Sequence, residues 1–267
     1  MKLQNHQIYK ENIIIYIIIF SFTVLISCTT TKYQMDNTNN GENSMIGIDT
    51  SQLEKDEIFS LLTYAIVYKY WDPIDRGGRG YNVGCILVND SFQVLDYGLN
   101  HVSELDNATQ HGEVRLITKY LEKEGIYSLI NHTIYSSLEP CAMCGGMMTM
   151  VSINRTVNGQ PDYFFSKALE RLAFNSEPYG GYSPYPRVVK SDNTPSIYGE
   201  ILDKEYHNYI EQGNKPILTK FLTTSIAKNI FKSASKDFLN FKTKYLENEM
   251  ILNQAMDFYN DLSATPK

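Results

Sequence analysis

Two short motifs hold side chains that could bind a metal ion and move protons. The first is His-Gly-Glu and begins at His111, and the second is Pro-Cys-Ala-Met-Cys and ends at Cys144. Together they supply one imidazole, two thiols and one carboxylate. Three protein ligands leave the fourth position of a tetrahedral zinc ion open to water, which is the pattern of catalytic zinc sites. The motifs therefore predict that His111, Cys141 and Cys144 bind Zn²⁺, and that Glu113 is a catalytic residue that transfers protons to and from the bound water.

Two predicted helices position these side chains. The cysteines are three residues apart at the start of one helix, so both sulfurs lie on one helix face, near free backbone N–H groups that stabilise thiolates. His111 lies in the first turn of a second predicted helix, over residues 109–124. If the two helices lie side by side on a sheet, their N-termini face the same point. Glu113 is two residues from His111, so it points away from the ligand direction and can reach the water without binding the metal.

The pattern of apolar residues and turn formers predicts an α/β fold. A helix capped by Ser51 precedes a hairpin, and strands then alternate with helices, which is typical of a mixed β-sheet with helices packed on it. Pro140 is expected in the first turn of the cysteine helix, where its missing N–H costs nothing. The predicted strands cover residues 83–88, 92–97, 133–138, 155–157 and 187–190, and the predicted helices cover 51–70, 109–124, a segment from 140 to 151 and most of 198–261.

The combination H-x-E and P-C-x-x-C is the signature of zinc-dependent nucleobase deaminases. The chain resembles the cytidine deaminase superfamily, and most closely its branch of tRNA-adenosine and guanine deaminases. The resemblance rests on four segments. They are the second zinc motif with the end of the strand before it (residues 137–144), the first strand (83–88), the segment Gly98-Leu99-Asn100, and the fourth strand with the turn after it (155–162). It implies a three-layer fold with helices on both faces of the sheet, and it covers roughly residues 52–212.

The resemblance also implies roles for single residues. Zn²⁺ would be held by the three ligands named above, and Glu113 would pass a proton from water to the ring nitrogen and then to the leaving amine. Asn100, Gly112 and Leu138 would contact the substrate, Asn100 by hydrogen bonding to the base. The middle residue of the His-Gly-Glu motif is usually alanine in that family, and Met147 stands where a small residue is usual. Both departures bear on which substrate is used and remove no zinc ligand.

The N-terminus predicts export and lipid attachment. An apolar run of signal-peptide length covers residues 13–27, and Leu-Ile-Ser precedes Cys28 as in the bacterial lipobox. We therefore expect a lipoprotein signal peptide over residues 1–27, a lipid on Cys28 and a polar tether over residues 28–50. The chain would then be anchored to a bacterial membrane and face the periplasm or the cell exterior. The alternative is an uncleaved anchor with an incidental cysteine.

Two other functions stay open at this stage. A non-catalytic, zinc-stabilised binding or structural lipoprotein would need the ligands but not Glu113. A thiol-redox protein would hold a Cys141–Cys144 disulfide and no metal, an alternative that export makes serious. Cys85 lies in an apolar strand and is expected to be an inert core thiol.

A small base or nucleoside is the expected partner, and a homodimer is left open. The formal net charge is −6, which does not favour a polyanionic nucleic-acid substrate. Residues 213–267 form a predicted helical C-terminal extension to the deaminase domain over residues 51–212. Within it, residues 215–244 hold seven lysines and one acidic residue beside an apolar stripe. We expect this stripe to pack on the domain with its lysines in solvent; attraction to anionic lipid or nucleic acid is the alternative.

Overall fold

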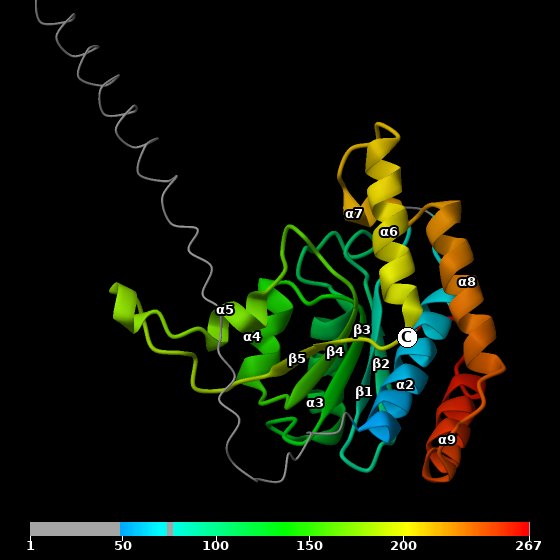
Figure 1. Ribbon diagram of the computed structural model, residues 1–267, viewed down its shortest axis with the longest axis horizontal. Coiled ribbons are helices and arrows are strands. Elements are labelled where there is room, and N and C mark those ends of the chain that lie inside the picture. The colour runs from blue at the N-terminus through cyan, green and yellow to red at the C-terminus, as the bar shows by residue number, and fades with distance from the viewer. Residues whose placement is uncertain (1–48, 74–76, 267) are drawn as a thin grey trace, which may run out of the picture. The chain divides into compact units, whose positions relative to one another are not determined.

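The computed structural model describes residues 49–73 and 77–266, which form one unit around a five-stranded sheet (Figure 1). The predicted signal peptide, Cys28 and nearly all of the predicted tether lie outside these residues. The strands lie in the order β2-β1-β3-β4-β5. β1 is antiparallel to both β2 and β3, whereas β3, β4 and β5 are parallel. Their bounds are β1 Gly84–Val88, β2 Val94–Leu99, β3 Thr133–Leu138, β4 Arg155–Gln160 and β5 Lys190–Asn193.

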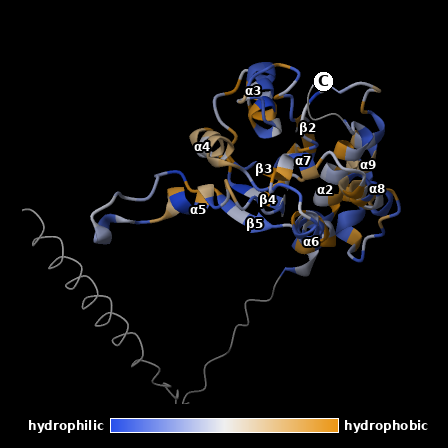
Figure 2. Cartoon of the chain, turned by 90° about the horizontal axis from the view of Figure 1, so that it is seen from above, coloured by the Kyte–Doolittle hydropathy of each residue, from blue (hydrophilic) through white to orange (hydrophobic). Residues whose placement is uncertain are grey.

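Helices cover both faces of the sheet, so the predicted mixed α/β fold in three layers is confirmed (Figures 1 and 2). The side chains of β1 alternate between two cores: Ile86 and Val88 pack with α2 and α6, and Cys85 and Leu87 pack with α3 and α4. This alternation is what a strand buried on both faces requires. The bounds are α2 Thr50–Lys69, α3 Gly112–Glu124, α4 Ala142–Met150, α5 Ala168–Ala173 and α6 Ile197–Glu211.

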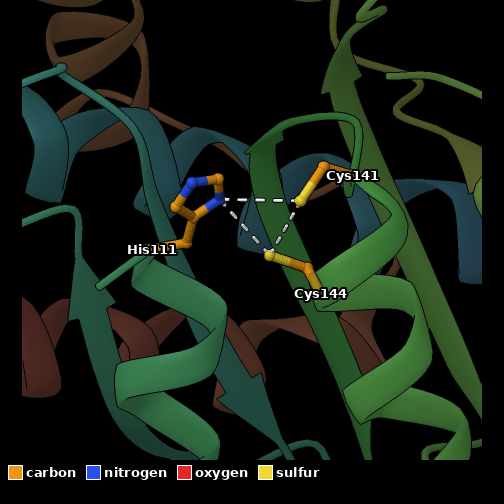
Figure 3. Close-up of side chains that lie close together, drawn as sticks. All are labelled: His111, Cys141 and Cys144. Carbon is orange, nitrogen blue, oxygen red and sulfur yellow. Dashed lines mark hydrogen bonds between the residues drawn. The ribbon is translucent and has the colours of Figure 1, made fainter. Parts of the chain in front are cut away.

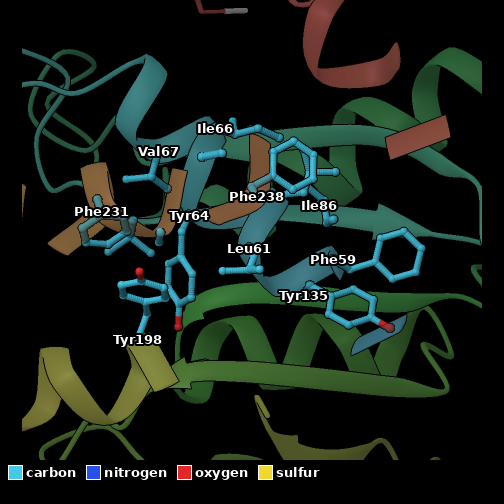
Figure 4. Packing of buried hydrophobic residues seen from close by; sticks show 14 of the residues in the cluster. Phe59, Leu61, Tyr64, Ile66, Val67, Ile86, Tyr135, Tyr198, Phe231 and Phe238 are labelled. Carbon is cyan, nitrogen blue, oxygen red and sulfur yellow. The ribbon is translucent and has the colours of Figure 1, made fainter. Parts of the chain in front are cut away.

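The central part of helix α2, residues 58–67, is buried on all sides instead of presenting one apolar face. These residues are buried without exception, because the sheet lies on one side of the helix and the C-terminal helices lie on the other (Figure 4). Tyr64, for example, packs edge-on against Tyr198 of α6 and Phe231 of α8. A helix that is apolar all round belongs in a core, and each large side chain buried there stabilises the fold by about 1.5–3 kcal/mol.

The start of α2 differs from the prediction. Asp49, not Ser51, caps the helix, and its carboxylate accepts hydrogen bonds from the N–H groups of Ser51 and Gln52. The Glu54 carboxylate, expected to complete a capping box, instead accepts hydrogen bonds from the backbone of the segment between α8 and α9, at Lys244 and Tyr245. The cap therefore lies two residues earlier than predicted, and Glu54 makes a contact with a segment that is distant in sequence.

The C-terminal segment, residues 213–266, is helical as predicted and shares the core with α2. Most of its apolar stripe is buried, at Leu218, Phe221, Leu222 and Phe231, whereas Ile217 and Ile226 are exposed. The lysines lie in solvent, so the packing interpretation agrees with the structure for most of the stripe. Across residues 49–73 and 77–266, no helix is long and apolar enough to span a membrane. The elements are α7 Leu218–Phe221, α8 Ser225–Leu239, a 3-10 turn η2 Leu246–Asn248 and α9 Glu249–Asn260.

Three strands begin later than predicted, β1 by a single residue at Gly84 and the other two by more. β2 begins at Val94 instead of at residue 92, because the Asn89 side chain accepts hydrogen bonds from the N–H groups of Ser91 and Gln93 and so extends the hairpin turn. Phe92 lies inside this turn with a positive φ of 59°. β5 begins at Lys190 instead of at residue 187.

Gly98 is where β2 touches the start of α3. A Cβ atom at this position would collide with the carbonyl oxygen of Gly112 and lie 2.8 Å from the Cβ of Leu116. Gly98→Ala should therefore lower the free energy of unfolding by about 2 kcal/mol or more, as overpacking does. Urea unfolding of the zinc-loaded protein measures this. The matched control is Gly146→Ala in α4, where the new Cβ meets nothing within 4 Å, and it should be neutral or stabilise by about 0.5–1 kcal/mol. Equal losses for both variants would contradict the explanation.

Candidate active site

The strand directions bring two helix N-termini to one edge of the sheet. β2 and β3 run in the same direction because both are antiparallel to β1, which lies between them. α3 follows β2 and α4 follows β3, so both helices begin at the carboxyl ends of these strands. Ligand sites of open α/β sheets lie at this edge. The start of β1 and the loop after β4 also reach it.

His111 and Cys141 occupy the N-cap positions of α3 and α4. The predictions that His111 lies in the first turn of its helix, and Pro140 in the first turn of the other, are therefore wrong by a few residues. The cause is the extended backbone of both cap residues, with ψ of 153° at His111 and 174° at Cys141. The two cap residues and Cys144, in the first turn of α4, still point their side chains toward one another, as Figure 3 shows.

The separations of the three ligand atoms fit a zinc ion. Nδ1 of His111 lies 3.7 Å from Sγ of Cys141 and 3.6 Å from Sγ of Cys144, and the two sulfurs are 3.6 Å apart. Zn–S bonds of about 2.3 Å and Zn–N bonds of about 2.0–2.1 Å at tetrahedral angles place such atoms about 3.5–3.8 Å apart. Soft thiolate donors with one imidazole also favour zinc over magnesium or calcium. The residues present therefore fit Zn²⁺, and three ligands leave one position open.

Without a metal ion, the thiols of Cys141 and Cys144 have very different pKa values. Hydrogen bonds from the Cys144 thiol and from His111 lower the pKa of Cys141 to about 4, although burial acts in the opposite direction. The pKa of Cys144 is raised well above that of an ordinary thiol, because Cys144 donates its proton to Cys141 and is buried beside Glu113. Zinc binding requires both sulfurs as thiolates, so it must displace the Cys144 proton.

Glu113 lies beside the ligands without joining them. Its side chain is buried, and Oε1 accepts a hydrogen bond of 2.9 Å from the Ser136 hydroxyl on β3. Oε2 is 3.5 Å from the sulfur of Cys144. The carboxylate is thus held by one oxygen while the other lies beside the ligand group, and Glu113 lines the same pocket as His111 and Cys141. Ser136 was not identified from the sequence, although strand periodicity places it on the face of β3 that looks toward α3.

One pocket contains the predicted substrate contacts. Asn100, Gly112 and Leu138 line it together with His111 and Glu113. Further lining residues come from the start of β1, the end of β3, the loop after β4 and α7, and sequence reasoning gave no site role to any of these: Tyr81, Val83, Glu139, Asp162, Phe165 and Thr219. The structure therefore gathers every predicted site residue except Cys28, which lies outside the described residues.

Residues 74–160 match the family model of the cytidine and deoxycytidylate deaminase zinc-binding region. The match includes both zinc motifs and covers four of the five strands. The curated tRNA-specific adenosine deaminase of Haemophilus influenzae is 35% identical over 81 residues, which are 30% of this chain and 47% of that protein. The tRNA-specific adenosine deaminase 2 of Xenopus tropicalis is 36% identical over 83 residues, 29% of this chain and 48% of that protein.

A solved structure from work on A-to-I editing by tRNA:A34 deaminases is also similar. It is 29% identical, covers 42% of this chain and 78% of its own, and has a TM-score of 0.34. The present chain spans about half the length of the curated relatives that it matches. α6, α7, α8 and α9 lie beyond the zinc-binding region.

Within the zinc-binding region, Asn100 has an unused hydrogen-bond donor. The side chain is 2% exposed and its Nδ2 has no partner among the described residues. A buried amide donor without a partner costs about 1–3 kcal/mol. Because it lines the pocket, a bound molecule with an acceptor atom would satisfy it. The backbone carbonyl of Asn100 is held by Nη1 of the buried Arg79 at 3.1 Å.

Two carboxylates hold the loop between β4 and α5 at the mouth of the pocket. Glu139 accepts hydrogen bonds from the N–H groups of Asp162, at 3.3 Å, and Lys167, at 2.9 Å. Asp162 accepts hydrogen bonds from the N–H groups of Phe164 and Phe165, and burial raises its pKa. The loop thereby places Phe165, which is 63% exposed, at the rim.

Proposed function

We propose that this chain is a zinc-dependent hydrolase that deaminates a nucleobase, a nucleoside or a related aminoheterocycle and releases ammonia. The observation that carries the proposal is the position of Glu113, buried beside the His111, Cys141 and Cys144 group but outside it. A site that served structure alone would not need a buried carboxylate that lies beside its ligands and lines a pocket. The match to the deaminase zinc-binding region supports the same activity.

The residues divide the reaction between them. A bound Zn²⁺ would lower the pKa of a water in its open position and so supply the attacking oxygen at neutral pH. Glu113 Oε2 accepts the proton that this water loses, while Oε1 stays bound to the Ser136 hydroxyl. The same oxygen then donates that proton to the ring nitrogen next to the attacked carbon. The remaining proton of the attacking oxygen passes through Glu113 to the amine, the carbon–amine bond breaks, ammonia leaves and a carbonyl group remains. Asn100 Nδ2 donates to an acceptor on the ring and orients it.

The lining favours a substrate without phosphate groups. Glu113, Glu139 and Asp162 are carboxylates, and the residues of the described part of the chain that line the pocket include no lysine or arginine. A polyanion would need cations near its phosphates. We therefore favour a free base or nucleoside over a nucleic acid, although the curated relatives quoted above are named tRNA-specific adenosine deaminases.

An ammonia-release screen of the zinc-loaded full chain tests the proposal. The substrates are adenine, guanine and cytosine, their ribonucleosides, the 5′-monophosphates, and single-stranded RNA and DNA. We expect ammonia from at least one base or nucleoside and much less from its monophosphate. Zinc at one equivalent with no ammonia from any substrate would overturn the enzyme and support a non-catalytic zinc-stabilised protein. If RNA were deaminated in preference to the bases and nucleosides, the substrate would be a polymer, and the preference for a small substrate would be refuted.

We propose that the protein is exported and anchored to a membrane by lipid on Cys28. The apolar run over residues 13–27 and the Leu-Ile-Ser-Cys sequence support this assignment. Cys28→Ser in a bacterial host should move the protein from the membrane fraction to the soluble fraction or to an uncleaved precursor, as an immunoblot of both fractions would show. Cys85→Ser is the control and should leave the distribution unchanged. The same distribution and the same apparent molecular mass for both variants and the wild type would refute lipid attachment.

A further inference from the structure

The C-terminal segment reaches the substrate pocket. Thr219 of α7 lines the pocket together with Tyr81, Asn100 and Phe165. Residue 219 lies well beyond residue 160, where the deaminase zinc-binding region ends. α7 has only four residues, and a helix this short does not hold its own conformation in water. Something outside α7 must therefore fix its position at the pocket.

Core packing of Leu218 and Phe221 holds α7 in place, and Asn82 adds a directional polar contact at its end. Asn82 is completely buried, and its Nδ2 donates hydrogen bonds to the carbonyl oxygen of Leu222, the residue that ends α7, at 2.9 Å, and to the carbonyl oxygen of Asp72 at 2.6 Å. Its Oδ1 accepts from the N–H of Asp72 at 2.8 Å and from Arg79 Nη2 at 3.5 Å. Both side-chain atoms of Asn82 are thus occupied, and one bond joins segments that are far apart in sequence.

Arg79 connects Asn82 to the pocket by hydrogen bonds. Nη2 of Arg79 also donates to the carbonyl oxygen of Tyr70 at 2.6 Å, and Nη1 donates to the carbonyl oxygen of Asn100 at 3.1 Å. Hydrogen bonds thus run without interruption from the end of α7 through Asn82 and Arg79 to Asn100. Two walls of the pocket, at Thr219 and at Asn100, are attached to one buried amide.

We propose that α7 is a wall of the substrate pocket, that Thr219 limits the size of the ligand, and that Asn82 is the positioning residue that sets this wall against Asn100. The proposal rests on the proposed function only in taking the pocket as the site of a base or nucleoside. It assigns part of the specificity to a segment outside the zinc-binding region.

Ligand binding tests the wall directly. Calorimetry on the zinc-loaded full chain would use adenine, guanine, cytosine and their ribonucleosides as probes. Thr219→Phe should weaken the tightest ribonucleoside by about tenfold or more, because the ring fills space at the rim, and it should weaken the matching base less. Lys220→Phe, on the neighbouring exposed residue, should leave both affinities unchanged. The zinc content of both variants should equal that of the wild type.

The positioning role needs a control for general destabilisation. Asn82→Ala should weaken binding, or raise KM, by about tenfold, since it removes the hydrogen bond between the wall and the buried amide. Asn248→Ala is matched to it: Asn248 is also completely buried, and its Nδ2 bonds Ser51 and Glu54 far from the pocket. It should lower the melting temperature without a change in affinity.

The outcomes separate this proposal from the proposed function. If the probes bind but no ammonia is released, the proposed deaminase activity is refuted. The role of α7 as a pocket wall is still tested, because Thr219→Phe can be compared with the wild type by binding alone. Unchanged binding in Thr219→Phe, or binding of no probe by the wild type, would overturn the wall. Equal affinity losses in the Asn82 and Asn248 variants would overturn the positioning role, and if Asn82→Ala does not fold, Thr219→Phe alone decides the proposal.

Discussion

Replacing Glu113 with glutamine should lower kcat of the zinc-loaded protein by about 10²–10⁴-fold, which is the usual contribution of a general acid–base residue. Glutamine keeps the size of the side chain and can still meet the Ser136 hydroxyl, but it cannot accept the proton of the attacking water. Zinc content should stay at the wild-type value because Glu113 is not among the ligand atoms. Steady-state ammonia release and elemental analysis on the same preparation measure both quantities.

Ser136→Ala is the companion variant for this experiment. It removes the hydroxyl that holds Oε1 of Glu113 and leaves the carboxylate in place. We expect a smaller loss of kcat, about tenfold, since one neutral hydrogen bond to a charged group is removed. If Glu113→Gln kept wild-type activity, the catalytic assignment would be refuted and the metal group would be structural.

Replacing Cys144 with serine should abolish stable zinc binding and activity together. The hydroxyl is a far weaker zinc ligand than a thiolate, so the affinity should fall by more than the roughly 10–100-fold that follows loss of an outer hydrogen-bond partner. A competition titration with a colorimetric chelator measures this. Cys85→Ser is the matched control, since Cys85 is equally buried but lies outside the ligand group, and it should keep one equivalent of zinc.

The pH dependence of zinc binding follows from the same ligands. The pKa of Cys144 is raised in the metal-free protein, so this thiol carries a proton at neutral pH that zinc must displace. Zinc affinity should therefore decrease as the pH falls, with release of protons to buffer on binding. A thiol-redox protein would behave differently: it would bind no zinc and would form a Cys141–Cys144 disulfide under oxidising conditions.

Sequence reasoning located the chemistry because its signals are local. The ligands, Glu113 and Asn100 each belong to a short motif with fixed spacing, and such motifs keep their meaning without knowledge of the tertiary structure. Element boundaries were less accurate where a side chain decided them. Asn89 extended the hairpin turn, and Asp49 replaced Ser51 as the cap because Glu54 was engaged elsewhere.

The rest of the pocket could not be predicted in the same way. Phe165 and Thr219 reach the site because of strand direction and packing, and neither stands in a motif that indicates chemistry. α7, which carries Thr219, is joined to the rest of the pocket by a hydrogen bond between Asn82 and Leu222, which are 140 residues apart in the sequence. A contact at that separation has no local signature. The predicted boundary near residue 212 likewise remains a prediction, although the helices beyond it share a core with α2.

The burial of the central part of α2 on all sides has a consequence for the order of events during synthesis. α2 is the first element of the described fold to leave the ribosome, whereas α8 and α9, which cover its outer side, are the last. Residues 58–67 therefore keep apolar side chains uncovered until nearly the whole chain exists. Contacts between the two ends of a chain also slow folding, and exposed apolar surface attracts holding chaperones. Folding should thus be post-translational, so the chain would still be unfolded at the stage when an exported protein has to cross a membrane.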